Sequence, residues 1–206
     1  MRTLLIIFIL VCSLFTKIIS QTATTIYTPN RSVVPDTYII PEATAAQIAA
    51  LNQYALNTFP NATIVSNAST TYNCHGYAWH ITEGGNNTWI GYNTTTAEDI
   101  YWTDDSYYEI ACQLPDSKVS YASDNHSAIT TTTTNIFQSK WGNLPLMLHD
   151  KDYTSYNSST LKYYKKTFTV QAPSLCTSLD YTLNAPTGTT VSWSASPAGI
   201  VSLQTN

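Results

Sequence analysis

The stretch Tyr72-Asn73-Cys74-His75-Gly76-Tyr77-Ala78-Trp79 decides how the rest of the chain is interpreted. It places one cysteine between a loop rich in Asn and Thr and a short apolar run. We therefore expect Cys74 in the first turn of a helix that ends near Ile81, before the break at 84–87. Unpaired amides and the positive end of the helix dipole favour an anion at such a position. This lowers the pKa of a thiol, and the thiolate is the form that attacks.

A cysteine nucleophile requires an imidazole that takes its proton and a polar group that orients the imidazole. His126 fits the first role because it begins a predicted strand downstream of the helix, so the helix can pack on the sheet and bring the two groups together. The orienting group should come from the next strand. If His126 faces the helix, Gln138 or Lys140 could share that face. A bulge would instead bring Ser139 there, and spacing alone leaves the choice open.

The remaining histidines are expected to have structural or supporting roles. His75 adjoins Cys74 and is expected to point elsewhere, in a core or supporting role. His80 and His149 are interpreted as structural, with His149 the better outside candidate for the site. A zinc site of Cys74, His75, His80 and Cys112 is disfavoured, because no Cys-x-x-Cys pair exists and the two histidines are five residues apart rather than four. We therefore predict neither a metal nor another cofactor.

Aromatic residues at 100–110 surround the polar loop Thr103-Asp104-Asp105-Ser106. This segment is predicted to line a substrate groove, although filling a core is an equal alternative for aromatic side chains. The predicted groove residues are Trp79, Trp102, Asp104, Asp105 and Trp141. Lys140 and Trp141 have the alternative role of bracing the sheet and the wall of the site.

Hydrophobic spacing predicts one long helix before the cysteine and an antiparallel meander after it. Residues 41–44 open the helix, apolar side chains recur every three to four positions over 45–59, and Pro60 ends it. Short strands are expected at 32–40 and 63–65. Three consecutive strands and then two more are predicted at residues 118–122, 126–134, 136–141, 144–148 and 161–170.

Composition and the first residues indicate an exported protein. Charged residues make up 11% of the 206-residue chain and the net charge is −4, so no basic patch favours a nucleic-acid partner. Arg2, the apolar run 4–15 and the small Ser20 are typical of a signal peptide over residues 1–20. A lipid anchor at Cys12 is disfavoured by the large residue before it. Cleavage leaves seven basic and thirteen acidic residues, a net charge of −6, and no membrane association.

Three cysteines remain after cleavage: Cys74, Cys112 and Cys176. An odd count leaves one thiol free, and Cys74 is the natural candidate, while a Cys112–Cys176 bridge would join two different regions. Composition changes near Pro173, where short alternating strands separated by turns are typical of a β-sandwich. The roughly 35 residues available are far fewer than the roughly 100 of such a domain. Residues 171–206 are therefore predicted to be a truncated immunoglobulin-like fragment.

Four stretches resemble a family of secreted bacterial proteins of uncharacterised function. They are Cys-His-Gly-Tyr-Ala-Trp at 74–79, Tyr-Trp-Thr-Asp-Asp-Ser-Tyr at 101–107, Asn-His-Ser-Ala-Ile at 125–129 and Ser-Lys-Trp-Gly at 139–142. That family is similar, in its Cys-then-His order, to the papain-like NlpC/P60 and CHAP amidases and peptidases. The resemblance implies Cys74 as nucleophile and His126 as base. The third position departs from the NlpC/P60 pattern, and the C-terminal residues separately resemble immunoglobulin-like repeats of bacterial surface proteins.

Taken together, the sequence predicts an α+β, papain-like domain of NlpC/P60 type over residues 21–170, in which a helix packs on an antiparallel sheet. A truncated β-sandwich follows it. The expected function is a secreted cysteine hydrolase, with a cell-surface association as a further expectation, that cuts an amide bond in peptide or peptidoglycan. The alternative is a non-catalytic adhesion or carbohydrate-binding module on an immunoglobulin-like stalk, with the aromatic side chains of 89–108 as stacking surfaces.

Overall fold

The computed structural model of the chain describes residues 21–123, 125–169 and 191–192. The predicted signal peptide 1–20 and nearly all of the predicted fragment 171–206 lie outside these described residues. Of that fragment, only β14 (Val191–Ser192) is described, and it pairs in parallel with β13 (Phe168–Thr169). Within the described part of the chain, no helix is both long enough and apolar enough to cross a membrane.

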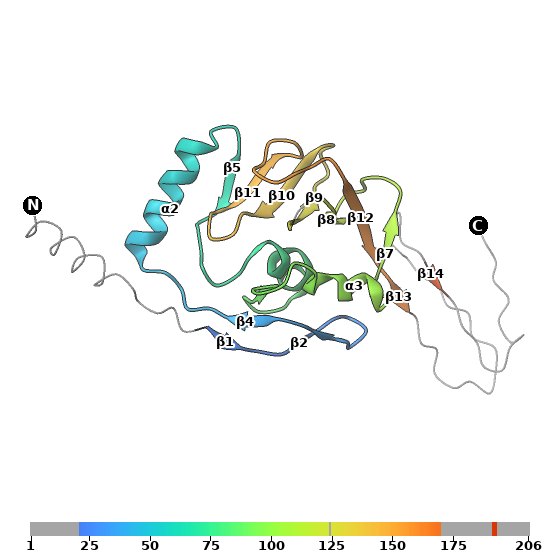
Figure 1. Cartoon of the computed structure of the whole chain (residues 1–206). Coiled ribbons are helices and arrows are strands. Elements are labelled where there is room, and N and C mark those ends of the chain that lie inside the picture. Colours follow the sequence, from blue (N-terminus) through green and yellow to red (C-terminus); the bar gives the residue numbers. More distant parts are fainter. Residues whose placement is uncertain (1–20, 124, 170–190, 193–206) are drawn as a thin grey trace, which may run out of the picture.

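A seven-stranded sheet forms the centre of the fold, in the order β5-β11-β10-β9-β8-β12-β7 (Figure 1). Every strand pair in it is antiparallel. Its strands are β5 (Thr63–Ser66), β7 (Tyr107–Ile110), β8 (Lys118–Tyr121), β9 (Ser127–Thr130), β10 (Ile136–Lys140), β11 (Leu146–Asp150) and β12 (Leu161–Lys166). With few helices against this sheet, the protein is an α+β fold.

The predicted meander is confirmed, because β8, β9 and β10 are consecutive antiparallel neighbours. One boundary was wrong: the second of these strands ends at Thr130 instead of continuing to Thr134. The hydroxyl of Thr131 donates to the carbonyl of Thr133 and accepts from its N–H, and Asn135 adopts a positive φ of 63°. These side-chain bonds to the backbone compete with the strand ladder and turn the chain.

Helix α2 (Ala45–Thr58) lies beside β5 at one edge of the sheet, as Figure 1 shows. It begins with a capping box, in which Gln47 donates its N–H to the Thr44 hydroxyl and accepts from the Thr44 N–H at 3.0 Å. Its buried face is narrower than the spacing predicted, because Ala55 alone among the residues of α2 is buried. Ala55 belongs to a cluster with Trp141 and Met147.

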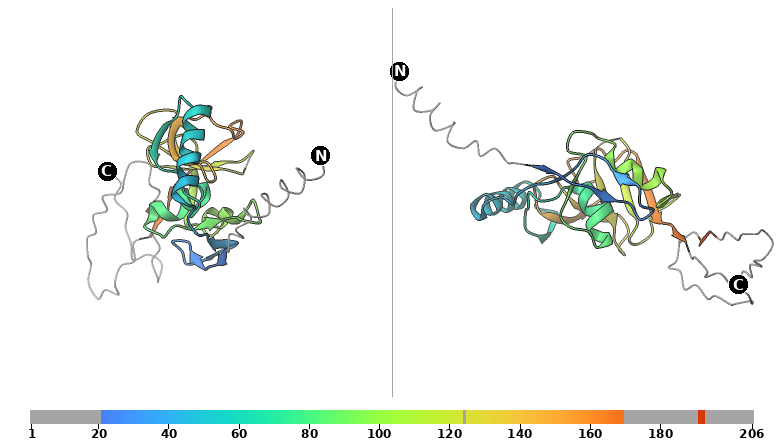
Figure 2. Two further views of the ribbon diagram at one scale, coloured as in Figure 1. Left: turned by 90° about the vertical axis from the view of Figure 1, so that its left-hand side faces the viewer. Right: turned by 90° about the horizontal axis from the view of Figure 1, so that it is seen from below.

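The N-terminal residues form short strands that lie on the other side of the fold from the large sheet, a separation also visible in Figure 2. β1 (Thr22–Ala23), β4 (Thr37–Ile39) and β6 (Trp89–Ile90) make a three-stranded sheet, and β2 (Ile26–Tyr27) pairs with β3 (Val33–Val34). The sequence predicted a single strand at 32–40. Asp36, with a φ of 53°, interrupts it between β3 and β4.

Residues 74–83, called here the Cys74 helix, are helical as predicted. The helix opens at Cys74, passes through a π-helical turn (Gly76–His80) and a 3-10 turn (Ile81–Glu83), and ends at Gly84, whose φ is 90°. π-Helical turns occur often at functional sites. The Cys74 helix therefore begins at Cys74 and continues as π and 3-10 turns instead of a regular α-helix.

The start of the Cys74 helix is pinned to β6. The Asn73 side chain accepts the N–H of Gly76 at 2.9 Å and donates to the carbonyl of Ile90 at 2.8 Å. A Cβ at Gly76 would lie 1.9 Å from the carbonyl oxygen of Thr88, so only glycine permits this approach. These contacts fix the backbone next to Cys74 and so the direction of its thiol.

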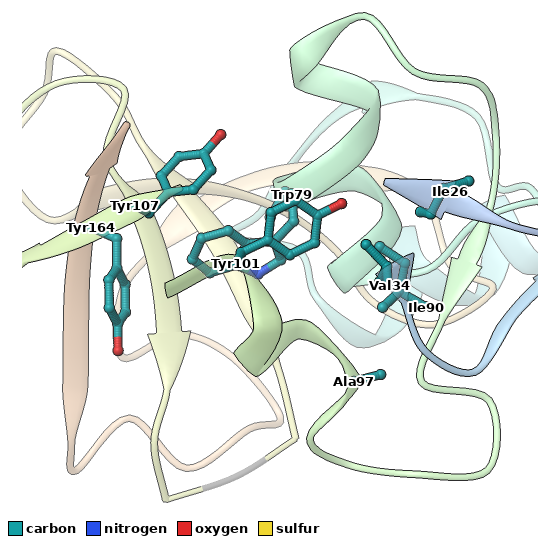
Figure 3. Close-up of a cluster of buried hydrophobic side chains, with 9 residues drawn as sticks. Ile26, Val34, Trp79, Ile90, Ala97, Tyr101, Tyr107 and Tyr164 are labelled. Carbon is teal, nitrogen blue, oxygen red and sulfur yellow. The ribbon is translucent and has the colours of Figure 1, made fainter. Parts of the chain in front are cut away.

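Trp79 fills the core between the Cys74 helix and the large sheet (Figure 3). Its ring stacks on Tyr101 at 5.5 Å and meets Tyr107 edge-on at 5.3 Å between ring centroids. Tyr101 belongs to α3 (Ile100–Thr103), which follows the 3-10 turn Ala97–Asp99. For these aromatic residues, filling the core is the interpretation that the structure supports.

Candidate active site

Cys74 and His126 meet where the Cys74 helix begins and β9 begins. Cys74 is 5% exposed, and His126, the residue before β9, is fully buried. Burial raises the pKa of the Cys74 thiol, and the charge of the His126 imidazole is among the effects that lower it. The turn between β8 and β9 places His126 near the start of the Cys74 helix, although the strand register puts its side chain on the opposite face of the sheet from Gln138 and Lys140.

A second imidazole, that of His75, also acts on the thiol through its charge. Its Nε2 lies 2.8 Å from Oδ1 of Asn125, and its Nδ1 lies 2.8 Å from the hydroxyl of Ser127. The Glu98 carboxylate is 3.4 Å from the same Nδ1. His75 is buried in a supporting role as expected, but it does not point away from Cys74.

His75 is held as a cation. Burial lowers the pKa of His75, but the charge of Cys74 and then the Glu98 carboxylate outweigh burial and raise that pKa to about 10. Burial also raises the pKa of Glu98, although the charge of His75 opposes this. Because both ring nitrogens have fixed partners and the ring keeps its proton at neutral pH, His75 cannot serve as the base.

The same two imidazoles make Cys74 an anion. Burial would raise the pKa of Cys74, but the charges of His75 and His126 hold it well below its ordinary value. A thiolate beside a cationic imidazole is the reactive form of cysteine. The site therefore combines a nucleophile with two basic groups in different environments.

Lys140 supplies a third basic group near Cys74. Its Nζ donates to the carbonyls of Ser69 at 2.8 Å and Gly142 at 2.7 Å, and it lies 5.0 Å from the centroid of the Tyr72 ring. No salt bridge within the described residues includes it. Burial lowers the pKa of Lys140 to about 7, although the charge of Cys74 opposes this. The thiolate thus provides counter-charge for a lysine that lacks a carboxylate in contact.

The pairing register determines which of the three residues predicted to orient His126 shares its face of the sheet. Gln138 lies opposite Ile129 and Phe137 opposite Thr130. Because opposite residues of antiparallel strands share a face and successive residues alternate, Ser139 lies on the His126 face without a bulge. Gln138 and Lys140 lie on the other face, toward the Cys74 helix, where Gln138 donates to the hydroxyl of Tyr77 at 2.7 Å.

Ser139 is already committed to a fixed chain of hydrogen bonds. Its hydroxyl accepts from Nε1 of Trp141 at 2.7 Å and lies 2.8 Å from Nε2 of His149. Nδ1 of His149 faces the carbonyl of Asp150 at 2.7 Å and must donate, so Nε2 accepts the Ser139 proton. Burial lowers the pKa of His149 to about 4, which keeps this ring neutral. His149 therefore has the structural role that was expected.

Two tyrosines surround the imidazole of His126. The ring of Tyr156 lies parallel to it, with 3.7 Å between centroids and an interplanar angle of 4°. Tyr121 meets it edge-on at 4.7 Å. Sequence reasoning missed Tyr156, because it lies in the loop between β11 and β12 and is one of 15 tyrosines with no distinguishing spacing.

A cleft of about 620 Å³ is lined by three residues that contact the imidazoles, whereas Cys74, His75 and His126 are not among its lining residues. Glu98 and Asn125 line it and contact His75 from behind, and Tyr121 lines it and contacts His126. Trp102 forms part of its wall as predicted, stacked on Tyr164 at 4.8 Å and 19°. The Oε2 atom of Glu98 is buried without a hydrogen-bond partner.

The other predicted groove residues do not line this cleft. Trp79 and Trp141 are buried, so neither presents a ring to a ligand in this structure. Asp104 accepts from the N–H of Ser106 at 3.0 Å and from the hydroxyl of Thr28. Asp105 is an exposed turn residue with a φ of 62°. Both aspartates shape their loop, which was the alternative for them.

Cys112 is an exposed free thiol, and its predicted partner Cys176 lies outside the described residues. Within the described residues, no group of three or more His, Cys, Asp or Glu side chains is arranged to hold a metal ion. Comparison of the chain with protein-family models, curated proteins and solved structures gives no match. The functional argument therefore depends on the geometry of the site itself.

The buried amine of Lys140 predicts a pH dependence of stability. Its folded pKa of about 7 lies below the ordinary 10.5, so between these values the unfolded chain binds a proton that the folded chain lacks. The free energy of unfolding then rises with pH across this window. Urea unfolding over the window should show this rise, and Lys140→Met should lose it. The exposed Lys162 provides the control Lys162→Met, and a Lys140→Met curve parallel to the wild type would contradict the assignment.

Proposed function

We propose that this chain is a secreted cysteine hydrolase with a papain-like arrangement of helix and sheet, acting on an amide bond in peptide or peptidoglycan. The observation that carries the proposal is the buried Cys74 thiol at the start of a helix, in contact with two imidazoles that lower its pKa. Export follows from the predicted signal peptide 1–20. The expected arrangement of an α-helix start against an antiparallel sheet agrees with the α+β fold.

The two imidazoles have different tasks in this proposal. His75 remains protonated because Glu98, Asn125 and Ser127 fix it, and it stabilises the thiolate as a permanent charge. His126 is flanked by aromatic rings and is the group left to exchange a proton. This division of labour separates the formation of the thiolate from the proton transfer that the reaction requires.

The reaction follows from these positions. The Cys74 sulfur attacks the amide carbonyl carbon, and the carbonyl electron pair moves to oxygen, near the first backbone N–H of the helix. Collapse of this intermediate breaks the C–N bond as protonated His126 gives its proton to the leaving nitrogen. His126 then removes a proton from water as that water attacks the thioester. The second collapse breaks the C–S bond and returns the thiolate.

The cleft beside the imidazoles is the proposed substrate site. Its lining includes Tyr121, which contacts His126, and Asn125, which contacts His75, together with the partly buried Trp102 and the exposed Thr96. An aromatic side chain such as Trp102 beside polar lining groups is suited to bind a peptide or a sugar. The substrate would therefore approach from the side of the β8–β9 turn.

Selective alkylation tests the nucleophile. Iodoacetamide should label Cys74 in the folded chain at neutral pH, with peptide mapping used to separate it from Cys112, the exposed reference thiol in the same molecule. His126→Gln should slow labelling of Cys74 at least about tenfold by removing a charge that holds the thiolate. His80→Gln, a half-buried histidine further along the same helix, should leave the rate unchanged.

Turnover provides the second arm of this test. Cys74→Ala should abolish release of new amino groups from peptidoglycan peptides, while His80→Gln should retain it. A folded chain in which Cys112 reacts and Cys74 does not would contradict the proposal. Equal labelling of Cys74 in wild type and His126→Gln would remove His126 from its assigned role.

Blocking the cleft tests the substrate site. Thr96→Trp should slow the reaction of a bulky maleimide at Cys74 if reagents approach through this cleft, because the added ring fills the cleft. Thr132→Trp is the matched control, since Thr132 is exposed at a separate cleft of about 710 Å³. The rate at Cys112 reports general changes in reagent access. Equal rates at Cys74 in both variants would place the approach of the substrate elsewhere.

A non-catalytic carbohydrate-binding module is the second candidate, and the stacked Trp102–Tyr164 pair on the cleft wall favours it. Glycan binding that survives Cys74→Ser but is lost in Thr96→Trp would support this candidate, provided that no amide turnover is found. The same binding accompanied by turnover would identify the cleft as part of the hydrolase.

A further inference from the structure

The three residues that spacing proposed for orienting His126 each have other partners. Gln138 donates a hydrogen bond to Tyr77, and Lys140 donates to the carbonyls of Ser69 and Gly142. The Ser139 hydroxyl donates a hydrogen bond to His149. The closest ring contact of His126 instead comes from a residue outside the strands. This residue is Tyr156.

Tyr156 covers one face of the imidazole. Its ring is stacked almost parallel to that of His126, at an interplanar angle of 4° and 3.7 Å between centroids, and His126 has no exposed surface. Tyr121 lies against the imidazole at 66°, which leaves little freedom for the ring to rotate. Side chains packed on two sides fix a rotamer without requiring a hydrogen bond.

The loop that carries Tyr156 is tied down at both ends. At its start, the N–H of Tyr153 donates to the carbonyl of Asp150 at 2.9 Å. At its end, the N–H of Ala122 donates to the carbonyl of Thr160 at 3.0 Å. Tyr156 itself packs against the cluster that contains Trp141 and Met147. The position of the ring is therefore determined by the fold.

We propose that Tyr156 is a positioning residue of this site, whose ring fixes the plane of the His126 imidazole and stabilises its charged form. The face of an aromatic ring carries negative potential and attracts a cation placed over it. An imidazolium stacked on Tyr156 gains this attraction, whereas a neutral imidazole gains less. The inference rests on the proposed function, because it assigns Tyr156 a part in keeping His126 protonated beside the thiolate.

Titratable groups on several elements act on or touch His126. Cys74 acts on it from the helix, His149 from β11 and Tyr121 from β8, and the Tyr156 phenol lies over its face. His149 is neutral over the physiological range, so it places no positive charge beside His126, and the thiolate and the stacked ring both favour the charged imidazole. A change at Tyr156 should consequently appear in the titration of Cys74.

The test compares Tyr156→Leu with Tyr156→Phe. Leucine fills much of the volume without an aromatic face, whereas phenylalanine keeps the face and loses only the hydroxyl. The rate of iodoacetamide alkylation at Cys74 is measured against pH, with Cys112 as the reference. Tyr156→Leu should move the midpoint of the Cys74 profile upward by about one pH unit, which is about tenfold in thiolate below the midpoint. Tyr156→Phe should keep the wild-type profile.

A merely structural role for Tyr156 would lower thermal stability without moving this midpoint. Tyr156→Leu with a wild-type midpoint therefore overturns the inference. A midpoint moved equally by leucine and phenylalanine also overturns it, because the hydroxyl rather than the ring face would then be responsible. If wild-type Cys74 does not react at all, the proposed function fails instead, which separates the two outcomes.

Proton NMR of the wild-type chain tests the stack without any substitution, in case Tyr156→Leu does not fold. Protons of an imidazole lying flat on a phenol ring are shifted upfield by the ring current. His126 should show this shift, and the half-buried His80 provides the comparison within the same chain. Ordinary shifts for the His126 ring protons would contradict the stacked arrangement.

Discussion

The contact of one buried thiol with two imidazoles is the interaction on which the rest of this structure depends. Removing a charge from water is costly unless an opposite charge meets it. Cys74 is 5% exposed and His75 and His126 are buried, so none of the three charges is stable alone. Glu98 extends the arrangement, because its carboxylate lies 3.4 Å from Nδ1 of the buried His75 ring. The thiolate and the His75 cation therefore each keep the other ionised.

The fold contributes by fixing where each charge sits. Asn73 and Gly76 hold the start of the Cys74 helix against β6, so the thiol cannot move along the helix axis. Asn125, His126 and Ser127 are successive residues of the antiparallel meander. His126 supplies one imidazole of the site, and Asn125 and Ser127 contact the other imidazole, that of His75. A single turn between β8 and β9 therefore controls the base, the partner groups of His75 and one wall of the cleft.

Much of the backbone could be predicted from local patterns. The helix at α2 has a capping box and a proline stop, and β8 to β10 have alternating side chains with short turns. The Cys74 helix has a break after it and a capping residue before it. Where the prediction was wrong, at the end of β9, hydroxyl groups of the threonine run bonded to the backbone instead of extending the strand.

The details of the site were harder to predict, because they depend on register and on distant loops. Whether Ser139 or its neighbours share a face with His126 changes with a shift of one residue, and no sequence pattern fixes that shift. Glu98 reaches His75 from a 3-10 turn, and Tyr156 reaches His126 from a loop. Neither residue lies in a periodic element, so neither has a spacing that marks it. The positions of Cys74 and His126 at the starts of regular elements were predictable, whereas the face of the sheet on which His126 lies was not.

The ionisation state of Cys74 is the central claim, and the ultraviolet band of its thiolate measures it directly. The band is titrated against pH as the difference between the native chain and Cys74→Ala, which removes the contribution of the other cysteines and the tyrosines. The account predicts that the thiolate band persists at about pH 6, well below the ordinary thiol pKa of about 8.5. A band that develops only near about pH 8.5 or above would show a neutral buried thiol, and the charge network described here would then be incorrect.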